Sequence, residues 1–291
     1  MSSMYKNCSS TVFEDFLDTP EFLELLAHAI ATVSIPTHLF AFYCVIFKTP
    51  VKVRSMKPAL LVSCLSYFLL DVELTVLSIP YVLAPAVAAF PIGVWNLFNI
   101  SLRHQCWMTF GLMTTLSTTS FILFSIPEQN QAKIYVFADI LPCLPQYIYD
   151  TPIFVIATNE IRIVSVTAIP VIEIVLEVIF FTISTYRHLY LKVDLRLSAN
   201  TRTLQEGIFT AICIQVTVPA IGLLFPTVYF VYVFMFDYFH QGMNNIAIAL
   251  YGLHGFMQAI SMIFIHRPYR QVVLCKDGKL SQLFRGTLAF S

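Results

Sequence analysis

Residues 207–236 read GIFTAICIQVTVPAIGLLFPTVYFVYVFMF, and none of these side chains carries a charge. A helix needs about 20 consecutive apolar residues to cross the hydrocarbon core of a bilayer. A strand of a membrane barrel alternates apolar and polar residues instead, whereas runs such as 178–183 (VIFFTI) are apolar at every position but Thr182 and do not alternate. The stretch therefore predicts a membrane-spanning α-helix.

Five further stretches qualify on the same grounds. Together with 207–236, the predicted spans are 25–47, 58–85, 105–124, 163–186 and 246–265. The composition agrees, because 57% of the 291 residues are hydrophobic and only 12% are charged, against about 25% charged in soluble domains. We predict an all-α, polytopic transmembrane helical bundle that forms a single domain, residues 1–291, in a lipid bilayer.

A seventh candidate span, residues 134–157, is ambiguous. It contains two carboxylates, Asp139 and Asp150, and three prolines. Carboxylates near the bilayer centre are costly, and proline removes a backbone hydrogen-bond donor. Taken alone, the stretch predicts a loop that lies on the outer surface.

Lysine and arginine concentrate in three segments, and this asymmetry predicts the orientation. The segments 48–57, 187–202 and 267–285 hold 13 of the 17 basic residues. Acidic residues gather before the first span, so we expect the N-terminus outside and the C-terminal tail in the cytoplasm. These positions require an odd number of crossings. The six predicted spans are an even number, so 134–157 or a neighbouring segment must also cross.

Several classes of function are disfavoured by the sequence. A net charge of zero and a pI near 7.0 suggest no nucleic-acid partner. The seven cysteines form no CxxC pair or Cys/His cluster, and no HExxH, GxSxG or P-loop motif is present. We therefore expect no enzyme and no catalytic, metal-binding or cofactor-binding residues.

A series of short motifs runs in order along the chain. It includes Thr49-Pro50, Asp71, Phe90-Pro91-Ile92-Gly93, Pro127-Glu128-Gln129, Gln215 with Pro219, and Pro268-Tyr269-Arg270. This order resembles the nematode serpentine chemoreceptors, which are seven-transmembrane G-protein-coupled receptors, and most closely their class H, over about residues 19–275. The resemblance implies a multi-pass plasma-membrane receptor of chemosensory neurons that detects a small-molecule odorant or tastant and acts on a heterotrimeric G protein.

The chain departs from the family's pattern after the third predicted span. The family has a Phe-Glu-Asn-Arg-like motif, a basic loop and a fourth helix there, but here Phe124-Ser125 leads directly into Ile126-Pro127. The fourth helix is therefore weak or missing. Two alternatives to a signalling receptor stay open, a truncated remnant that does not signal and a small transporter or channel.

Ionisable side chains inside the spans are costly and are therefore candidates for function. Asp71 matches an acidic position of the family and is expected to hold water, an ion or a polar contact between helices; the alternative is a packing hydrogen bond. Glu173 and Glu177 lie four residues apart on one helix face. They are expected to meet a cationic ligand or, if the helix begins later, to lie near the outer interface. Glu73 has no matching role.

Polar residues and prolines of the last two spans add further ligand or switch candidates. Gln215 and Pro219 lie along 207–236, where proline frees carbonyls and bends a helix in a way that suits a pivot. His254 is a candidate ligand contact or structural hydrogen-bond partner. In the first span, His28 and His38 are expected to be buried.

Three modifications are expected outside the helix interiors. Asn7 begins an Asn-Cys-Ser glycosylation motif, and Cys275 follows the last span amid basic residues, as palmitoylated cysteines do. Receptors of this architecture often join the start of the third helix to the following outer loop, which implies a disulfide between Cys106 and Cys143.

Overall fold

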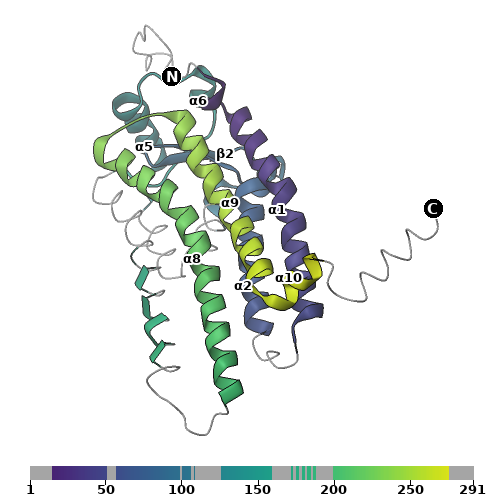
Figure 1. Ribbon diagram of the computed structural model, residues 1–291. Coiled ribbons are helices and arrows are strands. Elements are labelled where there is room, and N and C mark those ends of the chain that lie inside the picture. Colours follow the sequence, from purple (N-terminus) through teal and green to yellow (C-terminus); the bar gives the residue numbers. More distant parts are fainter. Residues whose placement is uncertain are drawn as a thin grey trace, which may run out of the picture.

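A computed structural model describes residues 15–50, 57–98, 100–105, 108, 126–158, 199–274 and ten single positions between 172 and 187. Within these residues, four helices are long and apolar enough to cross a membrane. They are Pro20–Lys48, Lys57–Leu77, Phe209–Phe236 and Gln241–Ile265. Figure 1 shows them side by side as a bundle, with a compact cap at the end where the described chain begins.

The first two helices pair as an antiparallel hairpin. Helix α1 (Pro20–Lys48) begins with Pro20 at its first position, and the Thr19 hydroxyl accepts a hydrogen bond from the Phe22 amide at 3.3 Å, as helix N-caps do. Helix α2 (Lys57–Val72) continues into one wide turn, η3 (Glu73–Leu77), which the Ser78 amide closes by donating to the Glu73 carbonyl at 2.8 Å. The two helices pack against each other.

The last three helices complete the described bundle. Helix α8 (Ala199–Phe236) carries Pro219 and Pro226 in its interior and packs along α9 (Gln241–Ile265). Helix α9 also packs on α1 and α2, so half of its most apolar stretch is buried. The short helix α10 (Arg267–Val273) follows at the end opposite the cap, beside the last turns of α1.

The cap is built from two segments that are distant in sequence. Strands β1 (Pro80–Leu83) and β2 (Ala88–Pro91) form an antiparallel hairpin, and β3 (Phe154–Val155) adds to β2. The 3₁₀ helix η4 (Val94–Phe98) follows β2. Between residues 126 and 158 the cap also contains α5 (Gln129–Tyr135), the π-helical turn η5 (Val136–Ile140) and α6 (Gln146–Asp150).

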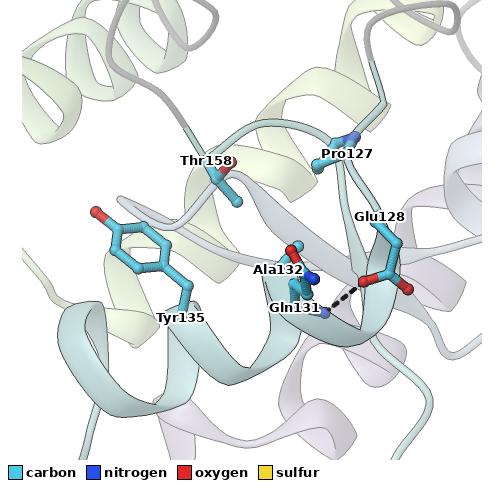
Figure 2. A pocket seen from close by; sticks show the side chains of 6 residues that line it. All are labelled: Pro127, Glu128, Gln131, Ala132, Tyr135 and Thr158. Atoms are coloured by element: carbon cyan, nitrogen blue, oxygen red, sulfur yellow. Dashed lines mark hydrogen bonds between the residues drawn. The ribbon is translucent and has the colours of Figure 1, made fainter.

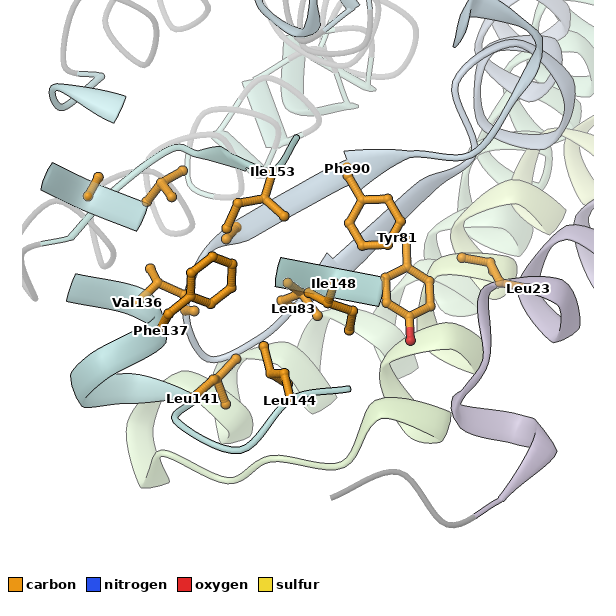
Figure 3. Close-up of a cluster of buried hydrophobic side chains, with 14 of the residues drawn as sticks. Leu23, Tyr81, Leu83, Phe90, Val136, Phe137, Leu141, Leu144, Ile148 and Ile153 are labelled. Atoms are coloured by element: carbon orange, nitrogen blue, oxygen red, sulfur yellow. The ribbon is translucent and has the colours of Figure 1, made fainter. Parts of the chain in front are cut away.

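An apolar core holds the cap on the bundle. Figure 3 shows side chains of the hairpin, such as Tyr81 and Leu83, packed against Val136, Phe137 and Ile148 of the 126–158 segment. Leu23 of α1 joins this cluster, which links the cap to the first helix. Since burial of apolar side chains is the main favourable term in folding, the apolar residues of 134–157 are held by this core.

The structure differs from the sequence predictions in two segments of the cap. Residues 134–157 form short helices and a strand, none of which is long enough to span a bilayer. The helix predicted over 58–85 ends at Leu77, and the apolar residues that follow enter β1 and the cap core. The predicted spans 105–124 and 163–186 lie outside the described residues except for isolated positions.

Candidate functional site

A polar cluster lies between α1 and α2 in the interior of the bundle. The Asp71 carboxylate accepts a hydrogen bond from the Ser34 hydroxyl, and its Oδ2 lies 3.0 Å from Nε2 of His38. Ser34 and His38 are fully buried and Asp71 is 1% exposed. The four-residue spacing of Ser34 and His38 places both on one face of α1, so that both reach the same carboxylate.

Helix α9 closes the other side of this cluster. A side chain at Gly255 would place its Cβ 2.2 Å from Asp71 Oδ1, so the helices approach closely here. His254 contacts the Tyr251 carbonyl through Nδ1, and its ring lies edge-on to Tyr67 with centroids 5.8 Å apart. Gln258, one turn further along, is 1% exposed, and neither of its amide atoms has a hydrogen-bond partner among the described residues.

The structure thus brings Asp71 and His254 together at the α1, α2 and α9 junction. His254 makes a contact within its own helix, to the Tyr251 carbonyl, and a role in ligand binding stays a prediction. His38 is buried as predicted, but His28 lies on the exposed face of α1, which contradicts the expectation that both are buried. No group of three metal-ligating side chains occurs within the residues that the structure describes.

Glu73 contacts the cap. Its carboxylate accepts a hydrogen bond from Trp95 Nε1 of η4 at 3.1 Å, although Glu73 is only 1% exposed. Glu73 is also the first residue of the wide turn η3. No role was predicted for Glu73 from the sequence, because its partner Trp95 lies 22 residues further along the chain, in η4.

Gln215 and Pro219 are both buried and lie on one face of α8. Gln215 Oε1 is 3.4 Å from Nε2 of His266, which joins α8 to the start of α10. Burial lowers the pKa of His266 below its ordinary value. One turn further, the Tyr269 hydroxyl bonds to the Thr49 hydroxyl at 2.8 Å. These contacts tie α1, α8 and α10 together at the end opposite the cap.

A second polar network joins α9 to the cap and to the first described residues. The Gly242 amide donates to Asp18 Oδ1 at 2.7 Å, and the Tyr81 hydroxyl donates to the Asp18 carbonyl. Asn245 donates to the Leu17 carbonyl at 2.8 Å, and Asn244 donates to the Ala84 carbonyl at 3.2 Å. The Asn244-Asn245 pair therefore orients the cap on the bundle.

Two pockets open in the cap. The larger, of about 500 Å³, lies against the α5 face that carries Gln131 and Tyr135, below Thr158 (Figure 2). At its rim the Glu128 carboxylate accepts hydrogen bonds from the Gln131 and Asn130 amides at 2.9 and 3.1 Å. These bonds lower the pKa of Glu128, so the carboxylate stays ionised and serves as the N-cap of α5. The second pocket, of about 430 Å³, lies beside β2 and η4.

Several predicted residues lie outside the described part of the chain. They are Asn7, Cys106, Glu173, Glu177 and Cys275. Cys143 is described and is disulfide-bonded, whereas Cys44, Cys64 and Cys213 are free. The pairing of Cys143 with Cys106 stays a prediction, as do the roles of the two glutamates.

The comparison with protein families decides the class of this molecule. The model described as "Serpentine type 7TM GPCR chemoreceptor Srh" matches residues 18–124 and 104–276. The chain belongs to this family. The two matched segments overlap, so residues 104–124 are matched twice. Membership in the Srh family confirms the predicted polytopic helical fold, and the family is one of receptors rather than of enzymes.

A curated relative supports the same assignment. This Srh-family chain is similar to Serpentine receptor class H-72 of Caenorhabditis elegans, with 24% identity over 299 aligned positions. The alignment covers 88% of this chain and 85% of the relative. No solved structure matches the chain.

Proposed function

We propose that this Srh-family protein is a chemosensory G-protein-coupled receptor that detects small-molecule odorants or tastants at the surface of sensory neurons. The observation that carries the proposal is the family match, which extends from residue 18 to residue 276. Bound ligand would act by its different affinity for two helix arrangements. A heterotrimeric G protein would read the arrangement at the end of the bundle away from the cap.

The distribution of charge supports an orientation with the cap outside. Lys48 and Lys57 flank the α1–α2 connection, and Arg270 lies in α10. All three belong to the end of the bundle opposite the cap (Figure 1). Because basic residues favour the cytoplasmic side, we place the C-terminal tail in the cytoplasm and the N-terminus outside.

The test combines topology with signalling. Epitope tags are placed at each terminus of the full chain, and antibody binding is compared in intact and permeabilised cells. We expect the N-terminal tag to be stained in intact cells and the C-terminal tag only after permeabilisation. Staining of the C-terminal tag in intact cells would contradict the receptor proposal, because the basic tail would then face away from the G protein.

Signalling is measured in the same cells with a co-expressed G protein and a panel of small volatile and water-soluble compounds. We expect at least one compound to activate the G protein only in cells that express the receptor. Retention of the chain in the endoplasmic reticulum would instead favour the truncated remnant. Solute flux through reconstituted vesicles would favour a transporter, for which the described residues offer little support because Asp71 is bonded to Ser34 and His38.

A further inference from the structure

The smaller pocket of the cap lies where two loops between helices meet. We call it the outer crevice; it is bounded by Phe90 and Pro91 at the end of β2, Asn96 of η4, residues 100–102, and Thr151-Pro152. Its volume of about 430 Å³ falls within the 300–1,000 Å³ that is usual for small-molecule sites. A compact organic molecule therefore fits between the hairpin side of the cap and its second segment.

The lining of the outer crevice selects for a neutral ligand. Its described residues carry no charged side chain and are mostly proline, phenylalanine, isoleucine or leucine. Among the polar side chains, Asn96 Nδ2 uses one of its two protons to donate to the Pro91 carbonyl, Thr151 Oγ1 donates to the Tyr147 carbonyl, and Ser101 Oγ bonds to His104 Nδ1. The Asn96 and Thr151 oxygens still offer lone pairs and Asn96 carries a second N–H, a combination that matches a ligand hydroxyl, which both donates and accepts.

The outer crevice is joined directly to the second membrane helix. Trp95, next to Asn96 in η4, donates its indole N–H to buried Glu73. The Gly93 amide donates to the Ser78 carbonyl at 2.9 Å, and a Cβ at Gly93 would lie 2.5 Å from the Leu77 carbonyl oxygen. Gly93 directly precedes η4, so the start of η4 packs on the end of α2 with no space for a side chain between them.

The end of α2 has the features of an element with two arrangements. It closes in a π-type turn, η3, and such turns are often found at functional sites. Ile79, which follows directly, is fully buried and has a φ of 44°, a conformation that costs free energy for a β-branched residue. A return of η3 to regular α-helix would shift the register by one residue and rotate Glu73 relative to Asp71.

We propose that the outer crevice is the ligand site of this receptor, that it takes small neutral alcohols with a hydrocarbon body, and that the Trp95–Glu73 hydrogen bond carries its occupancy to α2. This inference rests on the proposed receptor function and names its ligand class. The hydrocarbon body packs on Phe90 and Leu102, and the ligand hydroxyl donates to the Asn96 or Thr151 oxygen.

Binding is tested with the fluorescence of Trp95. The chain has two tryptophans, so Trp107→Phe in the full-length protein in lipid nanodiscs leaves Trp95 as the sole indole. Titration with 1-hexanol is expected to change its emission saturably, whereas hexane, which has no donor, and hexanoate, which is charged, leave it unchanged. Ser101→Phe, which fills the crevice, should abolish the response, and Asn96→Leu should weaken binding about tenfold, equivalent to about 1.4 kcal/mol.

The matched control is Arg103→Ala. Arg103 is an exposed neighbour that does not line the crevice, so this variant should leave the titration unchanged.

An equal response to hexane, or an unchanged response in Ser101→Phe, would overturn the site because the signal would then report alcohol dissolved in the lipid. Saturable binding without G-protein activation would support the crevice and count against the proposed function. If alcohols activate the G protein equally through the unchanged receptor and through Ser101→Phe, the proposed function is supported and the crevice is overturned as the ligand site.

The transmission step has its own test. Glu73→Leu should keep the saturable binding of 1-hexanol but reduce alcohol-dependent G-protein activation at least tenfold. Glu73→Gln, whose amide oxygen can still accept from Trp95, should restore much of the activation. Unchanged activation in Glu73→Leu at equal surface expression would overturn the role of the Trp95–Glu73 bond.

Discussion

A carboxylate that is buried between membrane helices requires hydrogen-bond donors, and for Asp71 these come from Ser34 and His38 of α1. A buried charged group that is left without such partners is costly. The hydrogen bonds of Asp71 therefore join α1 to α2 in the interior of the bundle.

The first prediction follows from these hydrogen bonds. His38→Ala should destabilise the receptor by roughly 3–5 kcal/mol, the usual cost of breaking a buried pair by removal of one partner. The double variant His38→Ala with Asp71→Asn should be more stable than His38→Ala alone, because no unpaired charge remains. Thermal unfolding in nanodiscs measures both, and a double variant that is no more stable than His38→Ala would contradict the pairing of His38 with Asp71.

At the residue scale, the sequence shows which polar residues lie inside the predicted spans but not which side chains they contact. Asp71 stands out because a charge within an apolar run is visible without a structure. That His38 and Ser34 meet it depends on which faces of α1 and α2 pack together, and hydrophobicity all round a membrane helix does not reveal this. Glu73 received no role for the same reason, since its partner Trp95 belongs to a turn that packs on α2 through the cap.

At the scale of elements, glycines set the distance between α2 and α9. Gly255 faces Asp71, and a Cβ at Gly252 would lie 2.9 Å from Thr75 Cγ2. Small residues at such positions let membrane helices approach closely. The two glycines lie three residues apart, so both are on the α9 face that packs on α2.

The second prediction tests this contact. Gly255→Ala should destabilise the receptor by about 1–3 kcal/mol, the usual cost of overpacking, because its Cβ would meet the Asp71 carboxylate. Gly207→Ala in α8 is the matched control, since a Cβ there has no neighbour within 4 Å, and alanine favours helix over glycine. The changes in melting temperature of the two variants should differ in sign or clearly in size. Equal changes would contradict the close approach of α2 and α9.

The third prediction concerns the contact between α8 and α10. Burial lowers the pKa of His266, so the unfolded chain binds a proton there more readily than the folded chain. The contribution of His266 is therefore fully present above the unfolded pKa of about 6.5 and is lost as the pH falls through the lower folded value. The melting temperature should drop on acidification from pH 7.5 to pH 5.

The matched variant for this prediction is His266→Phe, which keeps a ring against Tyr269 at a site where the two centroids are 5.3 Å apart but cannot take up a proton. Its melting temperature should fall less between pH 7.5 and pH 5 than that of the unchanged receptor. An identical fall in both proteins would assign the pH dependence to other groups and contradict the role of His266.

At this scale the sequence predicts the long helices but not the short segments of the cap. Helices α1, α8 and α9 lie within a few residues of the predicted spans 25–47, 207–236 and 246–265, except that α8 begins earlier. The three-stranded sheet was not predicted, because the apolar residues 78–85 look like the end of a span. Pro80 and Pro85 break the helical pattern there, and the side chains are buried in the cap instead of facing lipid.

At the scale of the whole molecule, the family match and the cap bear on the same segment. Residues 104–124 are matched both at the end of the first segment and at the start of the second. The described flanks of this stretch lie at the same end of the bundle. Residues 100–102 line the outer crevice together with Thr151-Pro152, and Gln129 bonds to Val155 of β3.

The last prediction follows from these flanks. Twenty residues separate Gln105 from Ile126, and as a straight helix they would extend about 30 Å, enough for one crossing and not two. If they crossed once, Arg103 and Asn130 would lie on opposite sides of the membrane. Because the cap holds both flanks, we expect Arg103→Cys and Asn130→Cys, both at exposed positions, to react with a membrane-impermeant maleimide in intact cells.

The control for this labelling is Leu274→Cys, at an exposed position beyond α10, which should react only after permeabilisation. Each variant is compared with the unchanged chain, so that reaction of the native cysteines is subtracted. Labelling of Arg103→Cys without Asn130→Cys would contradict the cap, because the stretch between them would then cross the membrane once. Labelling of both would mean that residues 106–125 do not cross the membrane, against the span predicted over 105–124. The outside N-terminus and the cytoplasmic tail would then be reconciled by the crossings of α1, α2, α8 and α9 and one further crossing between Thr158 and Ala199.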